Sequence, residues 1–360
     1  MSCDMSNVAP RLELEAFQTV VPINVTNPRQ TRRVSVTGAE GPGIFHGCLN
    51  VVLYYNKAKS EDSGWVVAGW FKESLQRCLA EQPLLSGRLR IVEDGKGQPE
   101  IVSNDSGVRL VEAKIPMTLQ EFLDVKGKQK LEAELVFWKE VDEQDPQFSP
   151  LLYVQVTNFQ CGGYSVGISC SLLLADILVM DNFISRWATI HKDILSKNEV
   201  LKLPIFYVPN LKPPSFSLAG TFSPAPSKNC GQTMIFMVAN EGMDLKNDLG
   251  KTIAGPFLEE AESKLNTNMP SEFYLLVKES PMVIKVHRCR KQEHANFHLN
   301  LKNKVTSSRW GDLGINGIAF YDGHEPAHVS LWVGSINDGL IMAIPNSFTP
   351  EMNIIVSVPN

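Results

Sequence analysis

The sequence predicts an α/β protein built from two sheet-centred halves. Helix-type and strand-type hydrophobic patterns alternate up to about residue 200, whereas the patterns after residue 231 are almost all strand. Between the two lies a segment, residues 204–231, that contains six prolines. Because proline fixes its own φ and restricts the preceding residue, this segment is predicted to be an extended crossover. We therefore expect an N-terminal domain of residues 1–203, a Pro-rich linker of residues 204–231 and a C-terminal domain of residues 232–360.

Length and composition set the class of protein. The chain has 360 residues, 43% of them hydrophobic, which is enough for one large core or two smaller ones. Its 34 Lys and Arg against 39 Asp and Glu give a net charge of −5, which argues against an electrostatic nucleic-acid binder. No apolar run approaches the roughly 20 residues of a membrane span, and residues 1–10 have no apolar segment typical of a secretory signal. The seven cysteines are scattered and never in Cys-x-x-Cys spacing, so we expect a reduced, cytoplasmic protein without a zinc site.

The first half begins with a predicted helix followed by an extended run. Asp62 and Ser63 are suitable helix caps, and apolar residues recur at helical spacing over 66–79. Pro83 ends this helix, and residues 84–92 continue as an extended run.

A hairpin and a second helix follow. Residues 151–159 and 164–170 have strand patterns and are joined by Cys-Gly-Gly at 161–163, a good hairpin connection. An amphipathic helix then begins near Asp176 or Asp181 and continues to about residue 194.

The second half is predicted to be mostly strand. Its one helical stretch, residues 243–265, is expected to be interrupted by Pro256. The expected strands are residues 233–238, 273–277, 282–287, 315–321, 328–333, 340–344 and 354–358.

The histidines do not form a convincing metal or catalytic cluster. His287, His294 and His298 lie in a segment rich in Arg and Lys, which favours a solvated loop over a metal site. His324 and His328 flank a proline-containing turn, and His191 lies on the apolar face of its helix, where a core role is favoured. Phosphate-loop and Gly-x-Ser-x-Gly motifs are absent from the sequence.

Three segments in a fixed order carry a family resemblance. They are PLLSGRL at 83–89, NDSGVRLVEA at 104–113 and the run from FQCGGYSVGISC at 159–170 to SLLLAD at 171–176. In this order the segments resemble the plant BAHD acyltransferases, and the last one resembles the strand that leads into that family's His-x-x-x-Asp motif. The resemblance implies two chloramphenicol-acetyltransferase-like domains, each a mixed β-sheet flanked by helices. The second domain is abbreviated here, mainly between residues 214 and 309.

The motif departs from the family at its catalytic position. The resemblance places the family's general base, a histidine, at Leu172, and leucine cannot accept a proton. A positioned general base typically contributes about 10²–10⁴ in rate. Asp176 is kept, and in the family this carboxylate holds the geometry of the site by pairing with an arginine. We expect Arg288 or Arg290 to be that partner, which gives Asp176, Arg288 and Arg290 structural roles.

The family's second signature, Asp-Phe-Gly-Trp-Gly before Lys-Pro, corresponds to FYDGHEP at 320–326 and is also degraded. Cys170 and Ser171 are poor substitutes for the missing base, because the thiol has no evident basic neighbour and the hydroxyl would face the other way along the strand. His324 is the remaining candidate, if the two domain faces meet as in the family. We also expect Tyr321 to lie with Leu172 and Asp176 in the interdomain cleft.

One branch of the family resembles the chain more closely than the ordinary transferases do. The sequences of residues 104–113, 159–163 and 322–326 are similar to those of the ECERIFERUM/Glossy-type branch, the proteins of cuticular wax formation. This implies a non-catalytic or weakly active homologue in acyl-CoA metabolism, with acyl-CoA as ligand, a fatty-acid elongase condensing enzyme as partner and a peripheral place at the endoplasmic reticulum. No permanently bound cofactor is expected. The alternative is an active acyl-CoA-dependent O- or N-acyltransferase that uses a substitute base.

Overall fold

The structure is a computed structural model of the chain. It describes residues 12–37, 43–57, 64–92, 98–179, 182–197, 232–239, 249–294, 305–308, 315–345 and 351–359. The Pro-rich linker at 204–231 and His298 lie outside the described residues.

The described residues form helices and strands in the following places. The strands are β1 (Glu13–Val20), β2 (Thr31–Thr37), β3 (Cys48–Tyr55), β4 (Arg88–Ile91), β5 (Pro99–Val102), β6 (Val108–Ile115), β7 (Leu152–Phe159), β8 (Tyr164–Ser171), β9 (Gln232–Ala239), β10 (Glu272–Ser280), β11 (Val283–Arg290), β12 (Val305–Ser308), β13 (His328–Gly334), β14 (Gly339–Pro345) and β15 (Glu351–Val358). The α-helices are α1 (Gly43–His46), α2 (Gly64–Glu81), α3 (Leu119–Asp124), α4 (Gln129–Glu132), α5 (Ala175–Val179), α6 (Phe183–Lys197), α7 (Leu249–Leu265) and α8 (Lys291–His294). Short 3-10 turns are η1 (Pro83–Ser86), η2 (Ala133–Leu135), η3 (Pro146–Phe148), η4 (Leu172–Leu174) and η8 (Ile315–Gly317).

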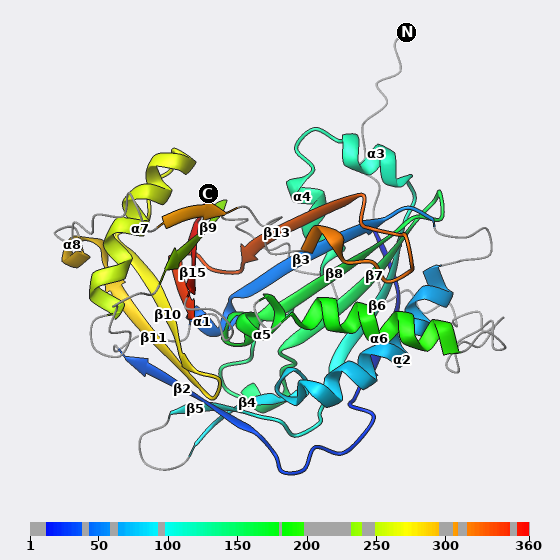
Figure 1. The fold of residues 1–360 in the computed structure, drawn as a ribbon, viewed down its shortest axis with the longest axis horizontal. Helices are drawn as coiled ribbons and strands as arrows, with labels where there is room; N and C mark the ends of the chain where they lie inside the picture. The colour runs from blue at the N-terminus through cyan, green and yellow to red at the C-terminus, as the bar shows by residue number, and fades with distance from the viewer. Residues whose placement is uncertain are drawn as a thin grey trace, which may run out of the picture.

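The strands make two mixed sheets (Figure 1). The first has six strands in the order β1-β6-β7-β8-β3-β13, and the second has nine in the order β12-β9-β15-β14-β10-β11-β2-β5-β4. Most neighbours are antiparallel, but β6–β7, β10–β14 and β11–β2 are parallel pairs. The predicted fold class, two mixed sheets flanked by helices, is confirmed.

The sheets do not follow the expected boundaries of 1–203 and 232–360. Three strands from the first part of the chain, β2, β4 and β5, extend the nine-stranded sheet. In return β13, from near the end of the chain, pairs antiparallel with β3 and forms an edge of the six-stranded sheet. Each half of the chain therefore contributes strands to the sheet formed mainly by the other half. The hydrophobic pattern of a single strand does not reveal this strand exchange.

Helices cover the sheets on the faces where apolar side chains gather. In Figure 1, α2 and α6 lie side by side along the six-stranded sheet, and α7 lies along the nine-stranded sheet. The largest apolar cluster runs from under α2 and α6 into strands of both sheets, with Leu49, Phe71 and Trp187 at one end and Tyr274 and Leu340 at the other. This shared core joins the two sheets.

Most predicted elements are confirmed, and three expectations are wrong. The hairpin at 151–170 is the antiparallel pair β7–β8, and its connection uses Gly162 at φ +84°. Residues 315–321 are a 3-10 turn and loop rather than a strand, and 83–86 are a 3-10 turn. The α7 helix runs through Pro256 without a break. A proline removes only one backbone hydrogen bond, and the buried Phe257, Leu258 and Ala261 hold this stretch against the sheet.

None of the helices among the described residues is both long enough and apolar enough to cross a lipid bilayer.

Candidate functional site

The motif residues lie where β8 ends against the junction of the two sheets. β8 is a central strand between β7 and β3, buried along its whole length. At its end the chain turns into η4, and the Ser171 side chain caps this turn by accepting a hydrogen bond from the Leu173 amide at 3.4 Å. The turn places Leu172 beside α1 and leads directly into α5, which carries Asp176.

Leu172 is a packed core residue. Its side chain is 1% exposed, and its amide donates to the Gly47 carbonyl at 3.3 Å. A Cβ on Gly47 would lie 2.5 Å from Leu172 Cδ1 and 2.6 Å from Ile336 Cδ1, so both side chains rest on this glycine. Leu172 and Ile336 together fill the space at the position that the resemblance assigns to the general base. The side chain at this position therefore carries no proton acceptor and is packed in the core.

Asp176 is the centre of a buried ionic cluster. Its carboxylate accepts from Arg32 Nη1 at 2.7 Å and Nη2 at 3.1 Å, and Lys278 Nζ lies 2.8 Å from Oδ2. Arg32 also donates to the carbonyls of Leu173 at 3.0 Å and Pro281 at 2.9 Å. Burial alone would raise the pKa of Asp176, but the charges of Arg32 and Lys278 outweigh it and hold this pKa below its usual value.

This cluster corrects the expected partners of Asp176. Arg288 Nη2 lies 2.6 Å from Glu272 Oε2 and 3.8 Å from Asp338, and Arg290 Nε lies 3.5 Å from Glu272 Oε1. Both arginines are on β11, near the end of the strand that pairs with Glu272 and away from the β10–β11 turn. The carboxylate instead meets Arg32 on β2 and Lys278 on β10, because strand exchange inserts β2 beside β11.

His324 lies at the wrong end of the sheet to replace the missing base. Its amide donates to the Tyr321 carbonyl in a turn containing Gly323 at φ +71°, and the Ala327 amide reaches the Tyr54 carbonyl at 2.7 Å. Tyr54 pairs with Ser165, six residues before Ser171 along β8. At about 3.3 Å per residue this separates the turn from Leu172 by roughly 20 Å. Tyr321, whose ring lies 5.5 Å from that of His191, is therefore also remote from Leu172 and Asp176.

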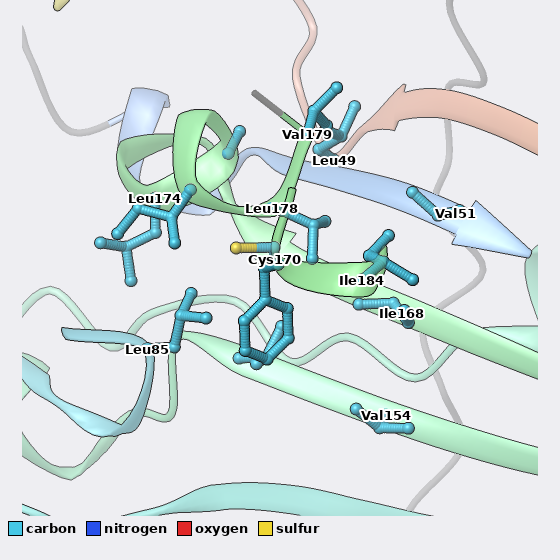
Figure 2. Close-up of a cluster of buried hydrophobic side chains, with 14 of the residues drawn as sticks. Leu49, Val51, Leu85, Val154, Ile168, Cys170, Leu174, Leu178, Val179 and Ile184 are labelled. Atoms are coloured by element: carbon cyan, nitrogen blue, oxygen red, sulfur yellow. The ribbon is translucent and has the colours of Figure 1, made fainter. Parts of the chain in front are cut away.

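The neighbouring thiols are not activated. Cys170 is fully buried in a cluster of apolar side chains that includes Leu174 and Leu178 (Figure 2). Burial raises the pKa of Cys170 well above its usual value, and the nearby Asp176 charge adds to this effect. Burial also raises the pKa of Cys48, to about 12. Neither thiol therefore supplies a thiolate at neutral pH.

A histidine that sequence reasoning passed over lies close to Leu172. His46 ends α1, immediately before Gly47, and its Nε2 lies 2.6 Å from Glu143 Oε1. Its carbonyl accepts from Trp138 Nε1 at 2.8 Å. The side chain borders a cavity of about 140 Å³, whose wall also includes Ile336.

His191 agrees with its predicted core role, but His287 does not lie in the expected solvated loop: it is part of β11, and its Nδ1 lies 2.7 Å from Thr37 Oγ1. His191 is buried, and burial lowers its pKa to about 3, so the ring is neutral. Its Nδ1 lies 3.0 Å from Ser74 Oγ, which also accepts from Trp187 Nε1. Within the described part of the chain, no three His, Cys, Asp or Glu side chains are grouped to hold a metal ion.

The comparisons with known proteins agree with the family that the motif resembles. The family model described as "Transferase family" matches residues 43–273, which is more than half of the chain. The chain belongs to this family, the BAHD acyltransferases.

Individual relatives are similar over shorter segments. The chain is 37% identical over 106 residues to "Protein ECERIFERUM 26-like" of Arabidopsis thaliana, a match that covers 29% of the chain and 24% of that protein. It is 32% identical over 182 residues to a hydroxycinnamoyltransferase of Narcissus pseudonarcissus, covering 49% of the chain and 40% of the relative. The matches thus span less than half of each relative's length. Among solved structures, vinorine synthase aligns over 97% of the chain and 94% of its own, at 15% identity and a TM-score of 0.49.

Five residues of the site escaped the sequence reasoning: Arg32, His46, Gly47, Lys278 and Ile336. Lys278 could have been noticed in the sequence, because it directly follows the apolar run 273–277 of a predicted strand. A lysine that is buried with such a strand needs a partner of opposite charge. Arg32 and Ile336 lie far from the motif in sequence and have no pattern of their own.

Proposed function

We propose that this chain is a BAHD homologue without histidine-based acyl transfer, which acts in acyl-CoA metabolism as a non-catalytic or weakly active protein. The process we propose is very-long-chain fatty acid elongation for cuticular wax, with an acyl-CoA as ligand and an elongase condensing enzyme as partner. The observation that carries the proposal is the buried Leu172, packed against Gly47 and Ile336 at the position of the general base.

Two further observations support it. Asp176 is engaged by Arg32 and Lys278, so its carboxylate holds the fold and is not available for proton transfer to a substrate. Similarity to an ECERIFERUM 26-like protein over 106 residues favours the wax-related branch over the ordinary transferases. A cytoplasmic protein that binds at the surface of the endoplasmic reticulum would suit this role.

The first experiment is direct titration of the purified protein with a short-chain and a very-long-chain acyl-CoA, by calorimetry and thermal shift. A ligand that binds only the folded state raises the melting temperature by mass action, so modest affinity is measurable. We expect the very-long-chain ligand to bind. Failure of both ligands to bind would overturn an acyl-CoA role.

The second experiment separates elongation from acyl transfer. Co-expression with an elongase condensing enzyme should lengthen the acyl products, and Leu172→Met, which keeps the volume without adding a base, should leave this effect unchanged. Leu172→His combined with Ile336→Ala restores a base and opens space beside it, so it should raise acyl transfer by about 10²–10⁴ if acyl-CoA is bound. Substantial transfer by the unaltered protein would contradict the proposal.

One observation favours the alternative, an active O- or N-acyltransferase with a substitute base. His46 precedes Gly47, whose carbonyl accepts from the Leu172 amide, and it is held by Glu143. In this alternative His46→Gln abolishes transfer, whereas His324→Gln leaves it unchanged. Activity that survives both substitutions would remove a histidine base from consideration.

A further inference from the structure

A buried carboxylate holds the edge strand β13 against the rest of the six-stranded sheet. Glu132 of α4 is 6% exposed, and its Oε1 accepts from Ser330 Oγ on β13 at 2.6 Å and from the Tyr54 hydroxyl on β3 at 3.1 Å. Burial and the neighbouring Glu132 charge raise the pKa of Tyr54, so its phenol keeps the proton that it donates. Because β13 pairs with β3 at the edge of the sheet, these side-chain bonds are a second attachment for the strand.

A contact between a lysine and a histidine extends this attachment to the first residue of β13. Lys128, at the start of α4, places its Nζ 3.6 Å from Glu132 Oε1 and 3.0 Å from His328 Nε2. A lysine ammonium only donates hydrogen bonds, so His328 Nε2 is the acceptor and carries no proton. The imidazole also lies against Tyr54, with 5.5 Å between the ring centroids. The contact between Lys128 and His328 therefore needs a neutral imidazole.

The groups around His328 keep its ring neutral. Among the described residues, the titratable groups that face it are Lys128 and Glu132 from the α4 segment and the Tyr54 phenol from β3. Burial, followed by the Lys128 charge, lowers the pKa of His328 below its usual 6.5, and the Glu132 charge opposes this only in part. The single negative charge of Glu132 cannot balance both Lys128 and a protonated His328. A proton on the ring would thus place two positive groups 3.0 Å apart.

The two ends of β13 differ in burial. Residues 328–331 are partly exposed, whereas Trp332, Val333 and Gly334 are buried. Local opening costs least where few apolar side chains are buried. Loss of a side-chain contact at His328 should therefore loosen residues 328–331 and leave residues 332–334 paired with β3.

We propose that His328 is a pH-sensitive attachment point of β13: its neutral ring fastens residues 328–331 to the start of α4, and its protonated ring releases them. In mild acid the hydrogen bond from Lys128 is replaced by a repulsion between two cations, and the released residues separate from β3. The inference goes beyond the proposed role in elongation and does not rest on it, because neither acyl-CoA nor a partner protein takes part.

The test measures amide hydrogen exchange of residues 328–331 in the full chain at about pH 7.5 and about pH 5.5, with each rate divided by the intrinsic rate at that pH. One pH unit below the ordinary histidine pKa of about 6.5, proton binding favours the open state by up to about tenfold. We therefore expect the protection of these amides to fall about five- to tenfold in acid. NMR titration of the His328 ring should give a midpoint below about 6.5. Equal protection at both pH values, or a ring midpoint that is not lowered, overturns the proposal, and both are read on the unaltered protein.

Variants separate His328 from the other titrating groups. His328→Gln keeps a hydrogen-bond acceptor for Lys128 but does not titrate, so protection should be the same at both pH values. His324→Gln is the matched control, because it removes an imidazole from the turn that precedes β13, and it should leave the fall in protection intact. Lys128→Met should raise the midpoint of the His328 ring, because it removes the repelling charge. A pH dependence that survives in His328→Gln, or one that is lost in His324→Gln, contradicts the proposal.

Discussion

Replacing Asp176 with asparagine should destabilise the protein strongly without any role for the residue in catalysis. The carboxylate and the Arg32 guanidinium are each only 2% exposed, and Lys278 is 5% exposed. The neutral amide would leave two buried cations without their counter-ion and would turn an N–H₂ group or a single oxygen toward them. Breaking a buried ion pair from one side typically costs about 3–5 kcal/mol, so we expect a loss of that size in the free energy of unfolding.

The assay is urea unfolding followed by tryptophan fluorescence, in which a shift of the midpoint at constant slope measures the change in stability. Glu81→Gln is a matched control. Glu81 makes a similar two-point contact with Arg186, at 2.6 and 2.7 Å, but the two side chains are 43% and 52% exposed. An exposed pair contributes only about 0–1 kcal/mol. Equal effects of the two substitutions would refute the buried-cluster reasoning.

The same reasoning fixes the pH dependence of this cluster. The folded-state pKa of Asp176 lies below its unfolded value of about 3.9. Its stabilising contribution is therefore complete above about pH 4 and is lost as pH falls through the lower folded-state pKa. The stability gap between the unaltered protein and Asp176→Asn should accordingly be constant at neutral pH and narrow in strong acid.

Three other predictions can be checked on the same preparation. Gly47→Ala should destabilise the protein by about 1–3 kcal/mol through overpacking, and adding Leu172→Ala should relieve part of that loss in a double-mutant cycle; strictly additive effects would argue against the contact between them. Brief iodoacetamide treatment followed by peptide mapping should label the exposed Cys161 before the buried Cys48, Cys78, Cys170 and Cys289. His191 has a folded-state pKa of about 3 and an unfolded value near 6.5, so stability should fall as pH drops from 6.5 toward 3; His191→Leu should flatten this slope, and an unchanged slope would exclude a neutral buried imidazole.

Local features of the fold were predictable because they follow from short-range chemistry. The β7–β8 hairpin needs only two apolar strands and Gly162 at a positive φ, all of which can be read from nearby residues. The helical spacing at 66–79 likewise identified α2, since one apolar face must be buried. The loss of the general base at Leu172 is visible in the motif itself.

The partners of the site could not be predicted from one sequence. Asp176 and Arg32 are 144 residues apart, and nothing local to β2 shows that it joins a sheet formed mainly by the second half of the chain. The resemblance suggested Arg288 or Arg290 as the partner of Asp176. The partner is in fact set by which strand ends lie next to α5, and these are the ends that carry Arg32 and Lys278. The sequence resemblance made His324 a candidate for the substitute base. The register of β13 on β3 places it instead at the end of the sheet remote from Leu172.

Strand exchange also constrains how the chain can fold as it is synthesised. The six-stranded sheet stays open at β3 until residues 328–334 have left the ribosome, because β13 supplies its edge. Conversely β2, β4 and β5 are made early but must wait for β11 before they have a sheet to join. Such long-range pairings slow folding and leave strand edges exposed in the interval. Fragments cut between residues 204 and 231 should therefore be unstable apart, and recover the native fold only when both are present together.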